Sequence, residues 1–152
     1  MILQNIFITF VKKYDMKRID FCKLLINTRQ NAGVGKNEMC RLAGFTFNQL
    51  QLLEDKPNNF AIKKAINYLA ALHHVIVLSN SKSMTQITSA ERFALWLKQT
   101  RNGIYLQREL ADVVGCSYRT IANIEQHSNI PTIDVFLKIL EALKYNIEIK
   151  QI

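Results

Sequence analysis

Cysteine and histidine are the residue types most often found as metal ligands, nucleophiles and general bases, and their spacing in this chain supports none of these uses. The cysteines form no CxxC pair and no Cys/His cluster, and the histidines have no carboxylate pair or nucleophile at a helpful distance along the chain. An odd number of widely spaced cysteines also fits a reduced, cytoplasmic setting. We therefore expect no enzymatic activity, no metal site and no cofactor. The residues concerned are Cys22, Cys40, Cys116, His73, His74 and His127.

The residues at 107–125, QRELADVVGCSYRTIANIE, indicate a different kind of function, in which an exposed helix packed on its neighbour binds a partner. Ala111 is small enough to let two helices cross closely, and Gly115 can adopt the positive φ of a tight turn. Ile121 and Ile124 recur at helical spacing and would attach the second helix to a core. This spacing predicts a helix-turn-helix motif.

The motif has a divergent counterpart earlier in the chain. Residues 36–54, KNEMCRLAGFTFNQLQLLE, align without gaps on residues 107–125. Identities are few, Gly44 with Gly115 among them, but the apolar positions agree. The sequence therefore predicts an internal repeat of two copies.

Apolar residues recur at helical spacing throughout both copies. Ser117 is a good N-cap for one of the expected helices, and Thr88 with Glu91 forms a plausible capping box for another. The helices are expected near 18–31, 36–43, 47–55 and 59–72 in the first copy, and near 89–101, 107–114, 118–126 and 132–143 in the second.

Each copy then ends in an apolar or alternating run that predicts a β-strand, at 73–79 and at 145–152. A lone strand cannot satisfy its backbone hydrogen bonds, so two such strands invite pairing. We expect the strands 74–79 and 146–151 to pair across an internal pseudo-twofold axis. Pairing between chains is the alternative.

The predicted domain organisation has four parts. The N-terminal extension is apolar but lacks a basic region and a cleavage site, and it is too short for a membrane span of about 20 residues. The linker is polar and rich in Ser and Thr. The parts are an N-terminal extension at 1–16, a divergent helix-turn-helix domain at 17–79, a linker at 80–88 and a second helix-turn-helix domain with its strand at 89–152.

The run at 107–125, together with the later IPTIDVFLKILEALKYNIEI, resembles the lambda-repressor-like, Cro/Xre-type family of DNA-binding domains. The resemblance implies a mainly α fold of two tandem four-to-five-helix lambda-repressor-like domains, each followed by a short strand. It also implies a prokaryotic, cytoplasmic transcription regulator that binds double-stranded DNA. Repression by steric exclusion at an operator is the expected outcome, and no membrane association is expected.

In the second copy, the resemblance implies that Gln107 donates to a DNA phosphate at a helix N-terminus. Tyr118, Arg119, Thr120 and Asn123 would then face the bases. Arg119 is suited to guanine, and Asn123 is suited to adenine. The alternative is that these side chains form an ordinary solvated helix face.

The family also carries a structural salt bridge between the helix before the motif and the end of the recognition helix. By resemblance this pair is Arg101 with Glu125, and it recurs in the first copy as Arg29 with Glu54. We expect these four residues to stabilise the fold and not to contact DNA.

The first copy departs from the pattern where DNA would be read. Lys36 stands at the position of the phosphate-binding Gln. Phe47 and Leu52 are apolar, and exposed apolar residues more often mark packing or a protein interface than a DNA-reading surface. Residues 1–80 nevertheless carry 11 basic and 5 acidic residues, against 9 and 7 in residues 81–152. Charge therefore favours the first copy for phosphate contact, whereas helix chemistry favours the second for base reading. The possible second recognition helix presents Phe47, Asn48, Gln49, Gln51 and Leu52.

Several assemblies remain open at this point. Family members bind as dimers on inverted half-sites, so a homodimer or an intramolecular pseudo-dimer is expected. The rival hypothesis is an antitoxin of the HipB type, which binds a toxin protein and represses its own operon, and it accounts better for Phe47 and Leu52. A first copy kept only as a dimerisation scaffold is a third alternative.

Overall fold

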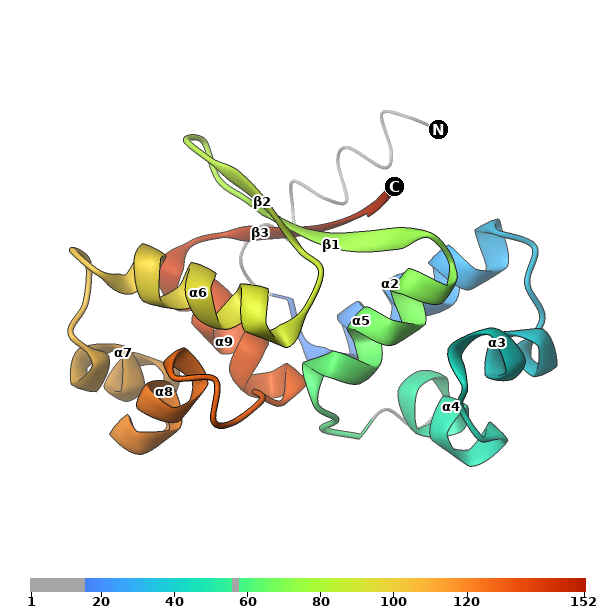
Figure 1. Ribbon diagram of the computed structural model, residues 1–152, viewed down its shortest axis with the longest axis horizontal. Helices are drawn as coiled ribbons and strands as arrows, with labels where there is room; N and C mark the ends of the chain where they lie inside the picture. The colour runs from blue at the N-terminus through green and yellow to red at the C-terminus, as the bar shows by residue number, and fades with distance from the viewer. Residues whose placement is uncertain (1–15, 56–57) are drawn as a thin grey trace.

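The computed structural model describes residues 16–55 and 58–152 (Figure 1). The predicted extension at 1–16 lies outside the described residues apart from Met16. The described part is mainly helical, with one small antiparallel sheet, as the sequence predicts. None of its helices is long and apolar enough to cross a membrane.

Among the described residues, the first half (16–79) and the second half (80–152) both contain a succession of four helices followed by a strand. The first half contains α2 (Arg18–Asn31), α3 (Lys36–Ala43), α4 (Phe47–Glu54), α5 (Ile62–Ala71) and β1 (His74–Ser79). The second half contains β2 (Met84–Ile87), α6 (Ala90–Arg101), α7 (Gln107–Val114), α8 (Tyr118–Glu125), α9 (Ile133–Leu143) and β3 (Asn146–Gln151). Only β2 has no counterpart among the described elements of the first half.

The helix starts are fixed by local hydrogen bonds. Ser117 caps α8 as predicted, since its hydroxyl oxygen accepts from the Thr120 amide at 3.2 Å. The predicted capping box of Thr88 with Glu91 is wrong. The cap of α6 is Ser89, whose hydroxyl accepts from the Arg92 amide at 3.0 Å, because the chain stays extended in β2 through Ile87 and the helix starts later.

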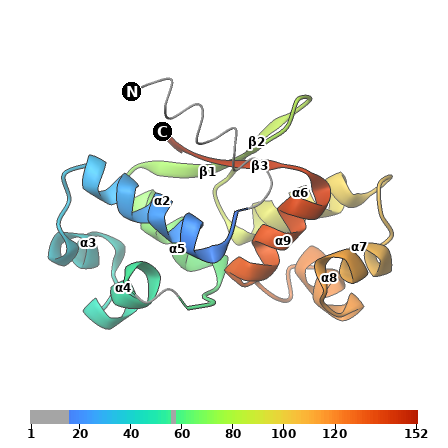
Figure 2. The same ribbon diagram turned by 180° about the vertical axis from the view of Figure 1, so that it is seen from behind.

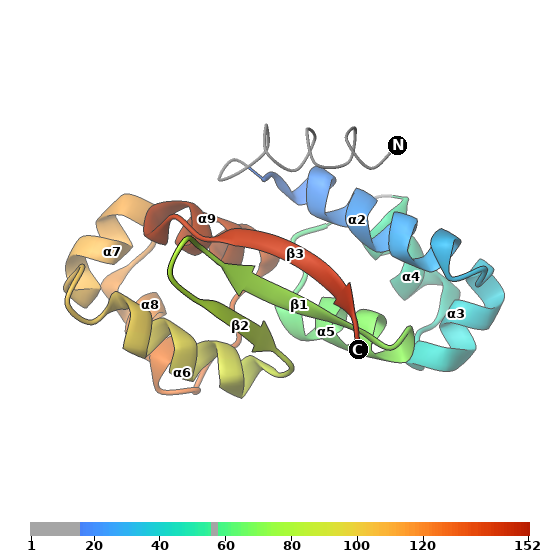
Figure 3. The same cartoon turned by 90° about the horizontal axis from the view of Figure 1, so that it is seen from above.

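The sheet joins the two halves. Its strand order is β2-β1-β3, and both pairings are antiparallel. His74 of β1 pairs with Gln151 of β3 at one end, which confirms the predicted pairing of the strands 74–79 and 146–151. Seen from above, β1 and β3 run across both halves (Figure 3).

The register of β1 with β3 is symmetric. Val77 and Glu148 occupy equivalent positions when the two halves are aligned, and they pair with each other. The two pairs that flank them change places when the halves are exchanged, so the ladder has a local pseudo-twofold axis near its centre. These flanking pairs are Ile76 with Ile149 and Leu78 with Ile147.

The halves meet a second time before α5 and α9. Ala61 and Thr132, which are equivalent positions, form an isolated antiparallel bridge. The Ile62 amide donates to the Pro131 carbonyl at 3.0 Å, and the Ile133 amide donates to the Phe60 carbonyl at 2.7 Å. Because residues 60 and 61 are used in this bridge, α5 begins at Ile62 and not at the predicted residue 59.

The predicted linker at 80–88 is not free of structure, because Met84–Ile87 forms β2. Asn80 closes the hairpin, since its side-chain oxygen accepts from the amides of Lys82 and Ser83 at 2.8 Å each. β2 satisfies backbone groups along one edge of β1, which would otherwise lack protein partners.

One hydrophobic core runs through both halves. It contains Phe21, Leu25 and Leu53 of the first half as well as Phe93 and Phe136 of the second. Seen from behind, α2 of one half lies next to α9 of the other (Figure 2). A shared core, a shared sheet and the bridge between equivalent residues hold the two halves as one body.

Candidate nucleic-acid interface

The turn between α7 and α8 is built as the sequence predicts. Gly115 has φ +83°, and its amide donates to the Ala111 carbonyl at 2.8 Å. A side chain would resist this left-handed conformation. Ala111 is buried at 1% exposure in the crossing of the two helices. The turn therefore fixes how α8 projects from α7.

α8 has an inward face and an outward face. Ile121 and Ile124 are buried at 0% and 1% exposure. Tyr118 is 47% exposed, and Arg119 and Asn123 are also exposed. The helix thus offers a phenol, a guanidinium and an amide to a partner.

Thr120, the fourth residue predicted to face the bases, is less exposed than the other three. Its side chain is half-buried, and its hydroxyl lies 2.9 Å from the Ser117 hydroxyl at the helix cap. Thr120 is therefore tied to the cap of α8 and is less available than its neighbours.

Arg108 is a neighbour of this surface that the sequence reasoning missed. It is exposed in the first turn of α7, and its guanidinium carbon lies 5.7 Å from the centroid of the Tyr118 ring. A cation in this position is attracted to the ring and holds it in place. The available signal was a basic residue directly after Gln107 at a helix N-terminus.

The carboxylate of Glu125, at the end of α8, accepts three hydrogen bonds. Arg101 donates from Nε to one carboxylate oxygen and from Nη2 to the other at 2.9 Å, and its Nη1 donates to the Tyr105 carbonyl at 2.9 Å. The hydrogen bond to Glu125 raises the pKa of Arg101. Gln107 donates from Nε2 to Glu125 at 3.0 Å. The carboxylate therefore positions the Gln107 side chain at the start of α7.

The first half has an equivalent pair, with a different third partner. Arg29 donates from Nε and Nη2 to Glu54 at 2.8 and 2.9 Å. Tyr68 of α5 donates its hydroxyl to the same carboxylate at 2.6 Å. Burial, and then the hydrogen bond to Glu54, raises the pKa of Tyr68. Glu54 is thus held from inside the core.

Lys36, at the position equivalent to Gln107, does not reach Glu54. Its Nζ lies 3.0 and 3.1 Å from the two carboxylate oxygens of Asp55. Both side chains are partly exposed, at 40% and 39%. The predicted phosphate-binding lysine is therefore engaged in an ion pair at the surface.

α4 exposes an apolar and an amide side chain. Phe47 is 48% exposed and Asn48 is exposed. Gln49 belongs to the cap of the helix, because its side-chain oxygen accepts from the Thr46 amide at 2.9 Å. Gln51 and Leu52 are half-buried. Of the five residues predicted for this surface, the first two are exposed and the other three are partly buried.

α4 and α8 lie on the same side of the molecule. Both are on the side opposite the sheet, one towards each end of the long axis (Figure 1), and the view from behind agrees (Figure 2). The shared core and sheet fix this placement. The two helices are therefore fixed on one side of a single body.

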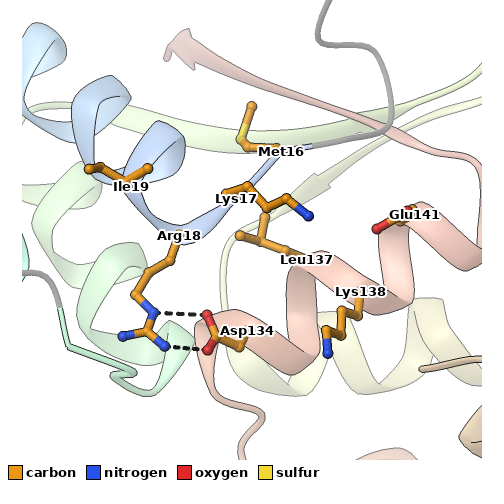
Figure 4. Close-up of a pocket in the computed structure, with 8 residues that line it drawn as sticks. All are labelled: Met16, Lys17, Arg18, Ile19, Asp134, Leu137, Lys138 and Glu141. Carbon is orange, nitrogen blue, oxygen red and sulfur yellow. Dashed lines mark hydrogen bonds and ion pairs between the residues drawn. The ribbon is translucent and has the colours of Figure 1, made fainter. Parts of the chain in front are cut away.

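A surface pocket of about 500 Å³ lies elsewhere, between the start of α2 and α9 (Figure 4). Arg18 and Asp134 pair across it through two hydrogen bonds, with Nε 2.9 Å from Oδ1. The hydrogen bond from Arg18 lowers the pKa of Asp134. No lining residue belongs to α4 or α8, so the pocket is separate from the exposed faces of these helices.

The cysteines and histidines are dispersed. Burial raises the pKa of the Cys22 thiol to about 11. His127 lies 3.4 Å from Glu91, and His74 Nδ1 lies 2.6 Å from the Leu72 carbonyl oxygen. Within residues 16–55 and 58–152, no three His, Cys, Asp or Glu side chains are grouped so that they could hold a metal ion.

Comparison with known proteins agrees with the geometry of the second half. Residues 97–150 match the model of a helix-turn-helix family, HTH_3. The matched range begins within α6, includes α7, α8 and α9 and ends in β3. Searches of curated proteins and of solved structures found no match. This part of the chain is therefore similar to helix-turn-helix domains, a class associated with DNA binding and transcription regulation.

Proposed function

We propose that this protein is a Cro/Xre-type, sequence-specific DNA-binding regulator that inserts α8 into the major groove. The observation that carries the proposal is the two-faced α8. Ile121 and Ile124 anchor it, while Tyr118, Arg119 and Asn123 project outward. An α-helix fits the major groove, where each base pair presents a distinct pattern of donors and acceptors.

The chemistry of the exposed side chains assigns their roles. Arg119 pairs with the O6 and N7 atoms of a guanine, and Asn123 pairs with an adenine. Tyr118, braced by Arg108, contacts a thymine methyl group or a phosphate. Gln107, held by Glu125, donates its second amide hydrogen to a phosphate at the N-terminus of α7.

In this proposal the first half is a divergent second copy of the motif, and one chain is an intramolecular pseudo-dimer. The symmetric register of β1 with β3 and the bridge between Ala61 and Thr132 support it. Occupation of an operator in a prokaryotic cytoplasm would repress transcription by excluding polymerase.

The experiment is selection of binding sites from a random DNA pool, followed by affinity measurements at a fixed salt concentration. Arg119→Ala should weaken binding to the selected site by about 1–3 kcal/mol and relax the preference at one base pair. Lys150→Ala removes a positive charge from β3, on the opposite side of the molecule, and should keep the preference. Equal affinity of Arg119→Ala and the unchanged protein for the selected site would remove Arg119 from base reading.

A second candidate function is an antitoxin-like regulator of the HipB type. The observation that favours it is the exposure of Ile104 and Leu106 in the loop before α7, at 58% and 69%. Exposed apolar side chains close together in the chain suit a protein partner. Co-expression with the product of the neighbouring gene tests this. A stable complex that Leu106→Ser weakens would support this function, and the absence of a complex would count against it.

A further inference from the structure

We infer that one chain reads an asymmetric DNA site whose two halves differ in base content, with Phe47 recognising thymine methyl groups in one half. This inference rests on the proposed function, because it requires that α8 binds the major groove. It goes further by assigning a ligand chemistry to α4.

The first step is the rigid coupling of α4 to α8. Both helices belong to one body with a shared core, sheet and bridge, so the fold sets which helix accompanies α8 on a duplex. Both lie on the side of the molecule away from the sheet (Figure 1). Paired recognition helices contact half-sites about one helical turn apart, about 34 Å, and this is the spacing that the inference requires of α4 and α8.

The second step is the difference between the two exposed surfaces. α8 offers Arg119 and Asn123, whereas α4, FNQLQLLE, contains no Arg or Lys. Identical helices in a homodimer read a palindrome. Two unlike helices in one chain read two unlike half-sites.

The third step is the chemistry of Phe47. Its ring stands 48% exposed in the first turn of α4, at the position equivalent to Tyr118 on α8. The first turn of a recognition helix reaches the base edges. A phenyl ring there cannot donate or accept a hydrogen bond, but it can pack on the C5-methyl group of thymine. Asn48 beside it can pair with adenine.

The expected site therefore has a guanine-containing half under α8 and an A/T-rich half under α4. Selection with the full chain should enrich sites with two unlike halves, and sedimentation should find one chain per duplex. An enriched palindrome bound by two chains would overturn this inference and the intramolecular pseudo-dimer, while leaving the role of α8 in DNA binding intact. Enrichment of no sequence would overturn the inference and the proposed function.

The thymine contact has its own test. Replacing thymine by deoxyuridine in the A/T-rich half removes only the methyl group. We expect about a fourfold loss of affinity for each contacted methyl group, because this is the change in affinity that corresponds to burying one hydrocarbon carbon. The same replacement in the guanine-containing half tests the proposed contact of Tyr118 and does not bear on Phe47.

Phe47→Ala should lose a similar amount on the thymine site and become insensitive to deoxyuridine. Leu95→Ala, on α6 and 47% exposed, is the matched control and should remain sensitive. Equal sensitivity of Phe47→Ala and the unchanged protein would overturn the role of Phe47. If Phe47→Ala does not fold, the deoxyuridine series with the unchanged protein decides, and a series without any loss refutes the contact.

Discussion

Glu54 and Glu125 occupy equivalent positions in the two halves, and each accepts two hydrogen bonds from an arginine of the helix that precedes the motif. Their third donors come from opposite directions. Tyr68 reaches Glu54 from the core, whereas Gln107 reaches Glu125 from the start of α7. The buried carboxylate of Glu54 thus completes a hydrogen-bond network in the core, whereas the equivalent carboxylate of Glu125 positions the side chain of Gln107.

The difference extends to the helix start that would face a DNA backbone. In the second half, Gln107 is oriented by a carboxylate that is 2% exposed. In the first half, Lys36 is drawn to Asp55 at the surface. The two halves therefore share an internal ion pair, while the side chains around that pair differ in what they contact.

The largest expected effect tests what the two halves share. Arg29→Met leaves the carboxylate of Glu54, which is 1% exposed, without its charged partner. We expect a loss of about 3–5 kcal/mol in the free energy of unfolding, measured by urea denaturation. Arg101→Met, the matched change in the second half, should cost a similar amount. Near-native stability of either variant would contradict a structural role for its ion pair.

The next largest effect is expected for Tyr68, which donates to Glu54 from the core. Tyr68→Phe removes one buried hydrogen bond to a charged group and should lower the free energy of unfolding by about 1.5–3 kcal/mol. DNA affinity of the folded variant should be unchanged. Tyr145→Phe is the control, since its hydroxyl contacts the exposed Ser83 hydroxyl and its loss should cost much less. A Tyr68→Phe variant with altered base preference would contradict a purely internal role for the hydrogen bond between Tyr68 and Glu54.

Much of this arrangement could be predicted from the sequence, because helical periodicity and the gapless alignment of the two motifs depend on local patterns. The strand pairing was also predictable, since two isolated strands need partners. β2 was missed because Met84–Ile87 is only four residues long and stands in a Ser/Thr-rich segment. Its reason for being a strand is the edge of β1, which is a tertiary feature.

The surroundings of the site were harder to predict. Tyr68 aligns with Ile139, and both are buried, so periodicity alone places both in the core. The hydroxyl of Tyr68 gains its role from Glu54, which lies on another helix. The contact of Arg108 with Tyr118 likewise joins two helices. Such contacts require the packing angles, which the sequence pattern does not contain.

A smaller effect is expected for Gln107, which donates to Glu125 from the start of α7. Gln107→Ala should lower DNA affinity by about 1 kcal/mol, and by the same amount on every sequence, because a phosphate contact carries no base information. The dependence of affinity on salt should keep its slope, since Gln107 is neutral and releases no counterion. Titration of several duplexes at two salt concentrations measures both. A changed base preference would contradict the phosphate role.

The smallest expected effect on stability asks whether the start of α3 can regain the role we propose for the start of α7. Asp55→Asn releases Lys36 from a partly exposed ion pair, so the free energy of unfolding should change by less than about 1 kcal/mol. If α3 faces the DNA backbone as α7 does, the freed ammonium neutralises one more phosphate. The salt slope of DNA binding should then steepen by about 0.9.

Glu148→Gln is the matched control for this change. It removes one acid and releases Lys150 on β3, on the side away from α4 and α8. The slope of this variant should stay that of the unchanged protein, because β3 lies away from the proposed duplex. If Asp55→Asn leaves the slope equally unchanged, Lys36 lies away from the phosphates even when it is unpaired. The two halves would then differ in how they approach DNA and not only in the side chains that they present to it.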